Sequence, residues 1–434
     1  MWHISSARGL PTTTAASRAL LPVAALLLGL TTAATSTAAP VPPVGAEAGS
    51  DRTVSTSAAQ AQIPAGVTAG VVVYDRQTGT FTEQVNASMQ FRSASVVKLL
   101  LTLDFFRDRG PNYTIPAADR ALLEPMLRSS YDEAADHYWV ARGGPAIIDR
   151  MVTQLGLSDT VGPPAGMEGF WGYTAISARD TVKIYRYILE QAPAPVREFI
   201  MTNLRQSTRC ASDAFDQHFG IAAAFDRPWA VKQGWSGEYE DGTCGPSGAS
   251  NAEAASKTSV SKTSAPNPAA DNAPEAGSES AARTPAVTRA AAQVDLARPA
   301  LHTTGTVGTG DRAIVAVLTL HPVGTSYGKA YTDLGRLTRS LDVPGATRPA
   351  GKWYGTWGSG VNVREAATTA RSLTRLPAGV EVLISCQKQG ETVSVPPYTN
   401  NWWAYLPQYG GYMSNIYVSS PDNKLPDVPV CATA

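Results

Sequence analysis

The side chains that most clearly offer chemistry are Ser95 and Lys98, three residues apart at the start of the most apolar predicted helix. Residues three apart share a helix face, so the hydroxyl and the amine can come into contact. The residues that follow Lys98 are apolar almost all round, which predicts a buried helix. Burial lowers the pKa of an amine because it disfavours the charged form. A neutral lysine beside a serine places a base next to a nucleophile.

The Ser-x-x-Lys pattern carries little information by itself, because it occurs three times in the chain. It recurs at Ser259 in a tract rich in Ser, Ala and Pro, and at Ser326 in a segment predicted to be a glycine-containing loop. Neither has a hydrophobic helix behind it, which favours an ordinary surface pair. For Lys98, the alternative is an amine that reaches solvent from a helix end.

A second hydroxyl and a second amine occur in suitable places. Ser130 lies in a short loop between two predicted helices, and Lys232 lies with Gly234 on a late predicted strand. A helix-placed Ser-x-x-Lys raises the question of a second hydroxyl and a second cation, and these two residues supply them. The alternatives are that Ser130 only caps the helix beginning near Asp132, and that Lys232 is an exposed strand lysine.

Apolar periodicity predicts strands, then many helices, then strands and a last helix. The predicted strands are residues 70–74, residues 80–85, residues 229–235 and two strands within residues 303–320. The predicted helices are the helix that carries Ser95, residues 117–127, residues 132–141, a helix after a capping box at Ser177, residues 196–204, and a helix through Leu334, Leu337 and Leu341. This order predicts an α+β fold. The first hairpin would pair with the late strands in one antiparallel sheet, and helices would pack against it.

Shifts in composition divide the chain. Residues 247–298 are dominated by Ala, Ser, Pro, Thr, Asn and Glu and have no aromatic residue, which favours a disordered insertion within one sheet over a linker between domains. Residues 47–64 are predicted to be a disordered tail. Residues 343–352 are rich in Pro and Gly and are predicted to be a linker to a small β-domain at residues 353–432.

The first 46 residues have the features of an export signal. Arg8 and Arg18 are the charged residues before Glu47, and residues 20–30 form an apolar core too short to span a bilayer. Small residues follow, with cleavage options near residues 37–39 and 44–46. The alternative is an uncleaved anchor. No cysteine lies in this region, which argues against a lipid-anchored form. We therefore expect a secreted or cell-wall-associated protein without stable membrane insertion after signal cleavage.

The chain has 36 basic and 36 acidic residues, so a near-neutral surface gives no reason to expect nucleic acid as a partner. We expect a monomer. In an exported chain, four cysteines indicate disulfides, and their positions favour the local pairs Cys210–Cys244 and Cys386–Cys431, although three connectivities are possible. The histidines are scattered singly and the cysteine spacing does not suit zinc, so we expect neither a metal nor a cofactor.

Taken together, these motifs resemble those of the penicillin-recognising serine enzymes, the class A β-lactamases and D,D-peptidases. Their elements Ser-x-x-Lys, Ser-x-Asn and Lys-Thr-Gly follow in this order, and the present sequence has SVVK at Ser95, SYD at Ser130 and KQG at Lys232. The hairpin GVVVYD before Ser95 is also similar. The resemblance covers residues 65–342 and implies a β-lactamase/transpeptidase-like domain.

The resemblance also implies roles. Ser95 would attack an amide or lactam carbonyl and form an acyl-enzyme, with Lys98 accepting its proton. Ser130 would relay a proton to the leaving nitrogen. Lys232 would supply positive charge for that relay and for a substrate carboxylate. The backbone N–H groups of Ser95 and Trp235 would hold the oxyanion.

The sequence departs from the family pattern at two positions that would contact substrate. Asp132 stands where the family has Asn, which exchanges a donor for an acceptor-only carboxylate. That carboxylate could instead pair with Lys98 and keep the lysine charged. Gln233 replaces Thr or Ser, so a hydroxyl that would hold a substrate carboxylate is missing. Gly234 and Trp235 complete the predicted substrate-binding set.

A third departure concerns deacylation. Glu168 is the carboxylate in residues 163–171, where class A enzymes carry their deacylating glutamate, but its motif context does not match. Without such a group, the acyl-enzyme would hydrolyse slowly. The protein would then bind β-lactams better than it destroys them.

The C-terminal residues 353–432 resemble a bacterial SH3-like domain through VNVR at Val361, the pair Trp402-Trp403 and GGYMS at Gly410. The resemblance implies binding of peptidoglycan peptides or glycans. The alternative is that the tryptophans are core or rim residues of a domain without a ligand. Two functions remain open: a secreted acyl-serine hydrolase acting on β-lactams or D-Ala-D-Ala-like peptides, or a catalytically inactive relative that binds cell wall through its cleft or SH3-like domain.

Overall fold

The structure is a computed structural model that describes residues 61–237, 239, 242–244 and 294–432. The predicted export signal, most of the predicted tail and of the insertion, and the Ser-x-x-Lys pattern at Ser259 lie outside the described residues. The domain boundaries therefore stay predictions. Among the helices that the structure describes, none is both long and apolar enough to cross a membrane.

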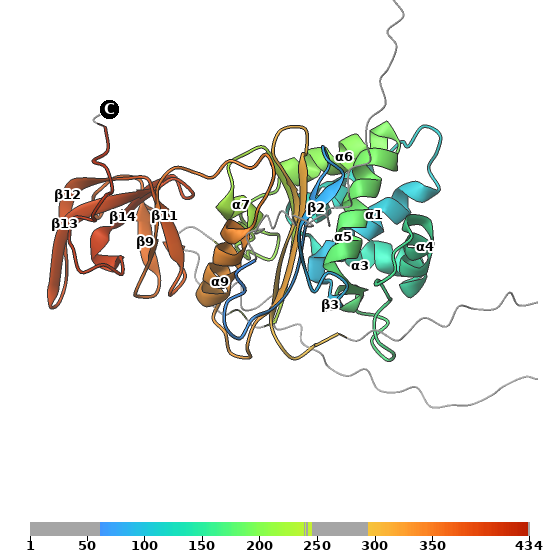
Figure 1. The fold of residues 1–434 in the computed structure, drawn as a ribbon, viewed down its shortest axis with the longest axis horizontal. Coiled ribbons are helices and arrows are strands. Elements are labelled where there is room, and N and C mark those ends of the chain that lie inside the picture. The colour runs from blue at the N-terminus through green and yellow to red at the C-terminus, as the bar shows by residue number, and fades with distance from the viewer. Residues whose placement is uncertain (1–60, 238, 240–241, 245–293, 433–434) are drawn as a thin grey trace, which may run out of the picture. The chain divides into compact units, whose positions relative to one another are not determined.

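A five-stranded antiparallel sheet forms the centre of the larger part of the described chain (Figure 1). Its strands are β1 (Thr68–Asp75), β2 (Thr80–Val85), β5 (Trp229–Ser236), β6 (Ala300–Val307) and β7 (Ala313–Leu320), in the order β2-β1-β7-β6-β5. The predicted pairing of the first hairpin with the late strands is confirmed, because β1 pairs with β7 along its whole length. Strand β5, which carries Lys232, lies at an edge of the sheet.

Helices cover both faces of this sheet (Figure 1). One face packs against α1–α6 and the other against α7 and α9, and alternate residues of β1 show the division: Val72 packs with the first group, whereas Val71 and Val73 pack with the second. The helices are α1 (Lys98–Arg107), α2 (Ala117–Arg128), α3 (Asp132–Ala141), α4 (Pro145–Leu155), α5 (Ala178–Arg186), α6 (Ala194–Arg205), α7 (Ile221–Ala224) and α9 (Tyr327–Ser340). The short elements are β3 (Phe91–Arg92), η1 (Ala94–Val97), η2 (Trp171–Tyr173), β4 (Ala175–Ile176) and η3 (Tyr187–Gln191).

Helix termini confirm one prediction and correct another. The Ser177 hydroxyl accepts a hydrogen bond from the Asp180 N–H, which caps α5 as predicted. The segment at Ser326 is not a loop, because Ser326 is the N-cap of α9 and accepts a hydrogen bond from the Lys329 N–H. This Ser-x-x-Lys pattern is a helix start, and its amine pairs with Asp333 at 2.7 Å.

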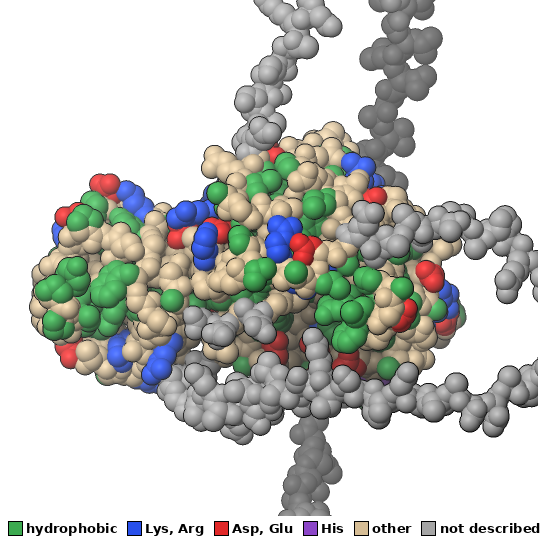
Figure 2. Space-filling model, turned by 90° about the horizontal axis from the view of Figure 1, so that it is seen from below, with side chains coloured by type: hydrophobic (Ala, Val, Ile, Leu, Met, Phe, Trp, Pro, Cys, Tyr) green, Lys and Arg blue, Asp and Glu red, His purple; other side chains and the backbone are tan. Residues whose placement is uncertain are grey.

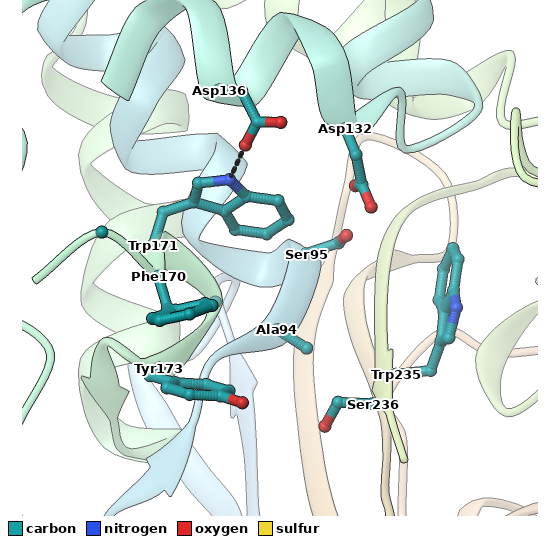
Figure 3. A pocket seen from close by; sticks show the side chains of 11 residues that line it. Ala94, Ser95, Asp132, Asp136, Phe170, Trp171, Tyr173, Trp235 and Ser236 are labelled. Atoms are coloured by element: carbon teal, nitrogen blue, oxygen red, sulfur yellow. Dashed lines mark hydrogen bonds between the residues drawn. The ribbon is translucent and has the colours of Figure 1, made fainter. Parts of the chain in front are cut away.

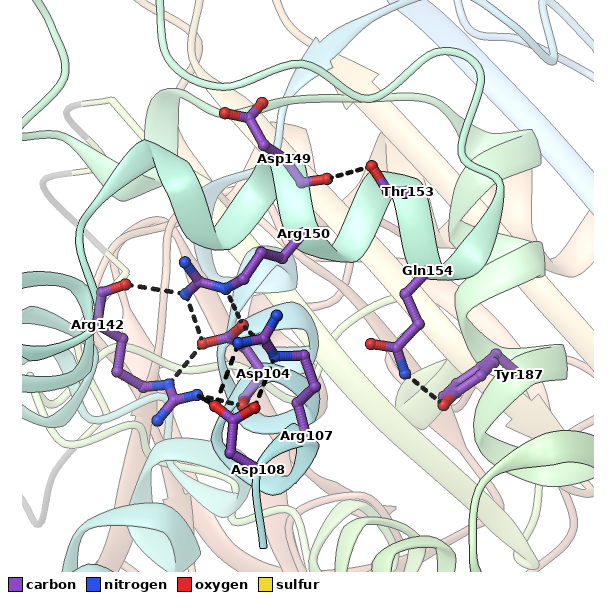
Figure 4. Close-up of polar contacts among 9 residues, drawn as sticks. All are labelled: Asp104, Arg107, Asp108, Arg142, Asp149, Arg150, Thr153, Gln154 and Tyr187. Atoms are coloured by element: carbon purple, nitrogen blue, oxygen red, sulfur yellow. Dashed lines mark hydrogen bonds and ion pairs between the residues drawn. The ribbon is translucent and has the colours of Figure 1, made fainter. Parts of the chain in front are cut away.

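The helix behind Ser95 is held by a buried carboxylate, Asp104 of α1 (Figure 4). Arg150 of α4 donates to it at 2.8 and 2.9 Å, and Arg142, which follows α3, donates at 2.5 Å. Because the three residues come from three parts of the chain, the cluster ties α1 to its neighbours.

The C-terminal part is all β, as predicted, and its strands form two sheets that are not closed into a barrel. One has the order β10-β9-β14-β13-β12 and the other pairs β11 with β8. The strands are β8 (Lys352–Gly355), β9 (Val361–Arg364), β10 (Ser372–Leu376), β11 (Glu381–Ile384), β12 (Cys386–Val395), β13 (Tyr398–Leu406) and β14 (Gly411–Ser414), followed by η4 (Asn415–Tyr417). An SH3-like domain stays a prediction.

Both predicted disulfides form, Cys210–Cys244 and Cys386–Cys431. The first closes a loop beside α2, and the second joins the start of β12 to the C-terminal end of the described chain. On the face that Figure 2 shows, basic and acidic side chains are interspersed among polar and hydrophobic ones. This mixture agrees with the equal numbers of basic and acidic residues in the sequence.

Candidate active site

Ser95 lies in a tight helical turn and not, as predicted, in the α-helix itself. Residues 94–97 form η1, and α1 begins at Lys98. The preceding Ala94 has φ 44°, a left-handed conformation that non-glycine residues rarely adopt. This turn brings Ser95 to the wall of a groove while Lys98, one turn later, is fully buried.

The Lys98 amine makes three hydrogen bonds. It donates to the Ser95 hydroxyl at 2.8 Å, to the Ser130 carbonyl at 2.7 Å, and to the Asp132 carboxylate. The amine also lies 4.5 Å from the centre of the Trp171 ring. The alternative in which this amine reaches solvent is therefore wrong, because the side chain is fully enclosed.

Ser130 joins the two lysines. Its backbone carbonyl accepts from Lys98, and its hydroxyl accepts from the Lys232 amine and donates to the Gln217 side chain at 3.1 Å. The N-cap position of α3 belongs to Tyr131, without a side-chain capping bond, so the capping alternative for Ser130 is wrong. Lys232 is buried, so the exposed-lysine alternative is also wrong.

Burial dominates the electrostatics of the two amines. It lowers the pKa of Lys98, and the ion pair with Asp132 opposes that shift. The pKa of Lys232 is lowered further, first by burial and then by the positive charge of Lys98. Desolvation by the surrounding protein and the negative charge of Asp132 raise the pKa of Asp213, which lies near the same lysines. Both amines are therefore easier to deprotonate than a lysine in water.

Gly234 and Gln233 are neighbours on β5 but have different structural roles. A side chain at position 234 would meet the Ser93 carbonyl at 3.0 Å, so glycine lets β5 approach the turn that carries Ser95. The Gln233 side chain is buried and donates to the carbonyls of Gln217 and Phe219 at 3.2 and 2.7 Å. Of the predicted substrate-binding residues, Gln233 and Gly234 therefore do not line the groove, whereas Asp132 and Trp235 do.

The groove beside Ser95 has a volume of about 360 Å³ and aromatic walls (Figure 3). Trp235 and Ser236 of β5 face Ser95 from one side, and the loop around η2 lies on the other. Its lining residues are Ala94, Ser95, Asp132, Asp136, Gly169, Phe170, Trp171, Gly172, Tyr173, Trp235 and Ser236. The predicted residues Ser95, Asp132 and Trp235 thus share one cavity.

Glu168 does not supply the predicted carboxylate. Its side chain is exposed and accepts a hydrogen bond from the Gly166 N–H at 3.0 Å within its own turn. This bond lowers the pKa of Glu168. Its backbone carbonyl accepts from the Trp139 indole at 3.0 Å, so the residue helps to shape the loop. Glu168 is absent from the groove lining.

Two parts of the site were not predicted. The loop at residues 208–217 places Gln217 against Ser130, and the amide of Gln217 also donates to the carbonyls of Arg128 and Thr208. The aromatic residues of the η2 loop form most of one wall. Their only sequence signal is the unusual density of aromatic residues at Phe170, Trp171 and Tyr173.

No protein-family model matches the chain, but individual proteins are similar to it. The chain is 34% identical over 175 residues to proteins of Mycobacterium tuberculosis and Mycobacterium bovis that are both named "Putative lipoprotein LppW". The match covers 39% of this chain and 54% of the relative, so the chain spans about half the length of the curated relatives it matches.

Solved structures similar to the chain include penicillin-recognising proteins. "Structure of PBP-A" has 15% identity and a TM-score of 0.41 over 66% of this chain and 94% of that one. A class A β-lactamase from Mycobacterium abscessus has 17% identity and a TM-score of 0.40 over 63% and 92%. TM-scores of this size assign neither fold nor activity, and the proposal below rests on the side chains of the groove.

Proposed function

We propose that the groove is an acyl-transfer site with Ser95 as its nucleophile, in a secreted hydrolase of the β-lactamase/D,D-peptidase type. The observation that carries the proposal is the continuous chain of contacts from Ser95 through Lys98 and Ser130 to Lys232. Two hydroxyls and two buried amines that are distant in sequence converge here. Such an arrangement supplies a nucleophile, its base, and a separate proton donor.

The reaction would proceed in two halves. The Ser95 oxygen attacks the carbonyl carbon while its proton passes to the Lys98 amine, which must be in its neutral form for this step. When the tetrahedral intermediate collapses, the bond to the leaving nitrogen breaks and the Ser130 hydroxyl gives that nitrogen a proton. Lys232, hydrogen-bonded to Ser130, returns a proton to the hydroxyl. Water then attacks the acyl carbon and its bond to the Ser95 oxygen breaks, so that the acid product leaves and the Ser95 oxygen regains a proton.

The oxyanion is proposed to lie between the backbone N–H groups of Ser95 and Trp235. These residues line the same groove from opposite sides (Figure 3). Strand β5 is an edge strand, so the side away from β6 has no strand partner. One such donor is worth roughly 3 to 4 kcal/mol of barrier.

The second half of the reaction is expected to be slow. The carboxylates that line the groove are Asp132, held by Lys98, and Asp136, held by the Trp171 indole. Glu168 is turned into its own loop. With no free carboxylate base placed beside Ser95 among the lining residues, a stable acyl-enzyme would accumulate.

A catalytically inactive wall-binding protein is the second candidate. The Asp132 carboxylate stabilises the charged form of Lys98, and a lysine that stays protonated cannot accept the proton of Ser95. The C-terminal part also carries an aromatic cluster: Trp357 lies 6.0 Å from Tyr398 and 5.6 Å from Tyr417, measured between ring centres. Trp357 and Tyr398 are exposed, which suits contact with sugar rings or peptides of the wall.

The test is covalent labelling of the whole secreted chain. The protein is incubated with a fluorescent penicillin and, separately, with a neutral peptide thioester, and its intact mass is measured over time. We expect one adduct per chain that maps to Ser95 and is absent from Ser95→Ala. Ser93→Ala, whose hydroxyl is buried two residues away, is the matched control. No Ser95-dependent adduct with either reagent would leave the wall-binding candidate.

A further inference from the structure

The charges around the groove do not suit a substrate carboxylate. The charged side chains among the lining residues are Asp132 and Asp136, and both are acidic. They lie four residues apart on α3, so they share one face of that helix at about 6 Å from each other. Figure 3 shows both above Ser95, with Asp136 beside Trp171 and Asp132 between Trp171 and Trp235.

The basic groups behind the groove have protein partners. The Lys98 amine contacts Asp132, Ser95 and the Ser130 carbonyl, and the Lys232 amine contacts the Ser130 hydroxyl. Burial lowers the pKa of both amines. The buried Arg92 donates to the carbonyls of residues 296 and 298. Neither Lys nor Arg is therefore presented to the cavity by the described residues that line it.

The Gln233 side chain does not offer a substitute. Its amide donates to the carbonyls of Gln217 and Phe219, and the residue is not among those that line the groove. A substrate carboxylate would therefore meet two aspartates and find no cation or side-chain amide among the lining residues. In a partly desolvated site, like charges repel strongly enough to decide which substrates bind.

The walls instead suit a positive charge. Asp132 is 57% exposed, so its carboxylate can still be approached after pairing with Lys98. Trp235 is stacked on Phe215 at 4.7 Å, which leaves its other face for the groove. Trp171 already contacts the Lys98 amine, and Phe170 stacks on Tyr173 beside it. Aromatic faces and carboxylates together are a favourable environment for an ammonium group.

We infer that the groove selects amide or ester substrates that carry a cationic amine close to the reacting carbonyl, and that Asp136 and the aromatic walls provide this selectivity. The inference rests on the proposed function, since it identifies the substrate class of the same site. It replaces the substrate-carboxylate role that the sequence resemblance implied for Lys232.

The test compares three matched peptide p-nitroanilides that place a lysine, norleucine or glutamate side chain next to the reacting carbonyl, each as both enantiomers. We expect kcat/KM to be about tenfold higher for lysine than for norleucine, as one desolvated charge contact would give, and lowest for glutamate. The preference should weaken in high salt because ions screen the attraction.

Variants assign the preference to the groove. Asp136→Asn keeps the acceptor for the Trp171 indole but removes the charge, and should reduce the lysine-to-norleucine ratio about fivefold, within the range of a single cation contact. Glu133→Gln makes the same charge change on the same helix at an exposed position outside the groove, and should keep the ratio. Equal ratios in these two variants would overturn the role of Asp136.

A binding measurement separates this inference from the proposed function. Ser95→Ala is titrated with the corresponding lysine, norleucine and glutamate amides while the fluorescence of Trp171 and Trp235 reports binding. Preferential binding of the lysine amide without turnover by the wild type would support the charge inference and overturn the hydrolase. Turnover or binding that favours norleucine or glutamate would overturn the charge inference, whereas Ser95-dependent turnover would still support the hydrolase.

Discussion

Two left-handed residues lie beside the reacting groups. Ala94 precedes the nucleophile with φ 44°, and Ser130 itself has φ 55°. A non-glycine residue in such a conformation costs roughly 1 to 3 kcal/mol and persists when its surroundings fix it. For Ser130 those surroundings are Lys98 at the carbonyl and Lys232 at the hydroxyl. The conformation thus turns the two polar ends of one residue toward two different amines.

Because Ser130 contacts both amines, it could act as a proton donor or could only shape the site. Kinetics with two kinds of leaving group distinguish these roles. If its hydroxyl protonates the leaving group, Ser130→Ala should slow acylation by an amide about 10²- to 10⁴-fold. Acylation by a thioester should fall much less, because a thiolate leaves without a proton. Stopped-flow rates of Ser95 acylation by the two substrates measure the difference.

The neighbouring hydroxyl provides the control. Ser129 donates to the Pro125 carbonyl at 3.0 Å and has no contact with either lysine amine. Ser129→Ala should therefore leave both acylation rates within about twofold, as expected of a substitution away from the reacting groups. An equal loss with amide and thioester in Ser130→Ala would mean that this residue only shapes the site.

At the scale of elements, the hydrogen bonds of Arg142 and Arg150 to Asp104 hold α1, the helix that begins at Lys98, against its neighbours. Asp104 is fully buried, whereas its partners Arg142 and Arg150 are 20% and 25% exposed. Asp104→Ala leaves the Arg150 guanidinium without a carboxylate partner, leaves Arg142 with Asp108 at 2.9 Å, and opens space under α1. We expect the substitution to lower the free energy of unfolding by about 3 kcal/mol. This value is at the lower end of the range for breaking a buried ion pair, because the arginine side chains stay partly exposed to solvent.

Urea denaturation followed by far-UV circular dichroism measures that loss. Asp149→Ala is the matched control, because Asp149 lies exposed on α4 in the same view (Figure 4). It should change the free energy of unfolding by less than about 0.5 kcal/mol. A similar small effect for Asp104→Ala would show that the cluster does not fix α1.

Local patterns explain which elements could be predicted. The bounds of β2 and α3 follow from apolar periodicity and from polar residues at their ends, and they match the structure. Helix α4 also had local evidence, a proline at its start and a left-handed Gly156 at its end, but was not predicted. Pairing of β1 with β7 could be predicted from the order of elements alone.

The site shows where local patterns fail. Ser95, Lys98, Ser130 and Lys232 could be found because their motifs recur in a known order. Gln217 could not, because its contact with Ser130 joins residues 87 apart through a loop with no motif. The orientation of the Gln233 side chain could not be predicted either. Its amide binds the backbone carbonyls of residues 217 and 219, and this contact depends on tertiary packing and not on a local pattern.

At the scale of the whole molecule, the buried His302 and His321 and the half-buried His218 make stability depend on pH. Burial lowers the pKa of His218, His302 and His321 to about 4. His302 shows the cause most clearly: its Nδ1 accepts from the Thr319 N–H at 3.0 Å and its Nε2 contacts the Arg92 carbonyl at 2.9 Å. A second ring proton would have to sit on Nδ1, facing another N–H donor.

An imidazole with a folded pKa below its unfolded value near 6.5 binds protons more readily in the unfolded chain. Its contribution to stability is therefore complete above pH 6.5 and is lost as the pH falls toward 4. We expect the free energy of unfolding to drop by about 2 kcal/mol per such histidine between pH 7 and pH 5.

Urea unfolding at both pH values tests this expectation with the variants His302→Asn and His137→Asn, of which the second changes an exposed residue. His302→Asn should reduce the drop in the free energy of unfolding by about 2 kcal/mol, and His137→Asn should leave the drop unchanged. A stability that is flat from pH 7 to pH 5 in the wild type would mean that these side chains open to solvent before they are protonated.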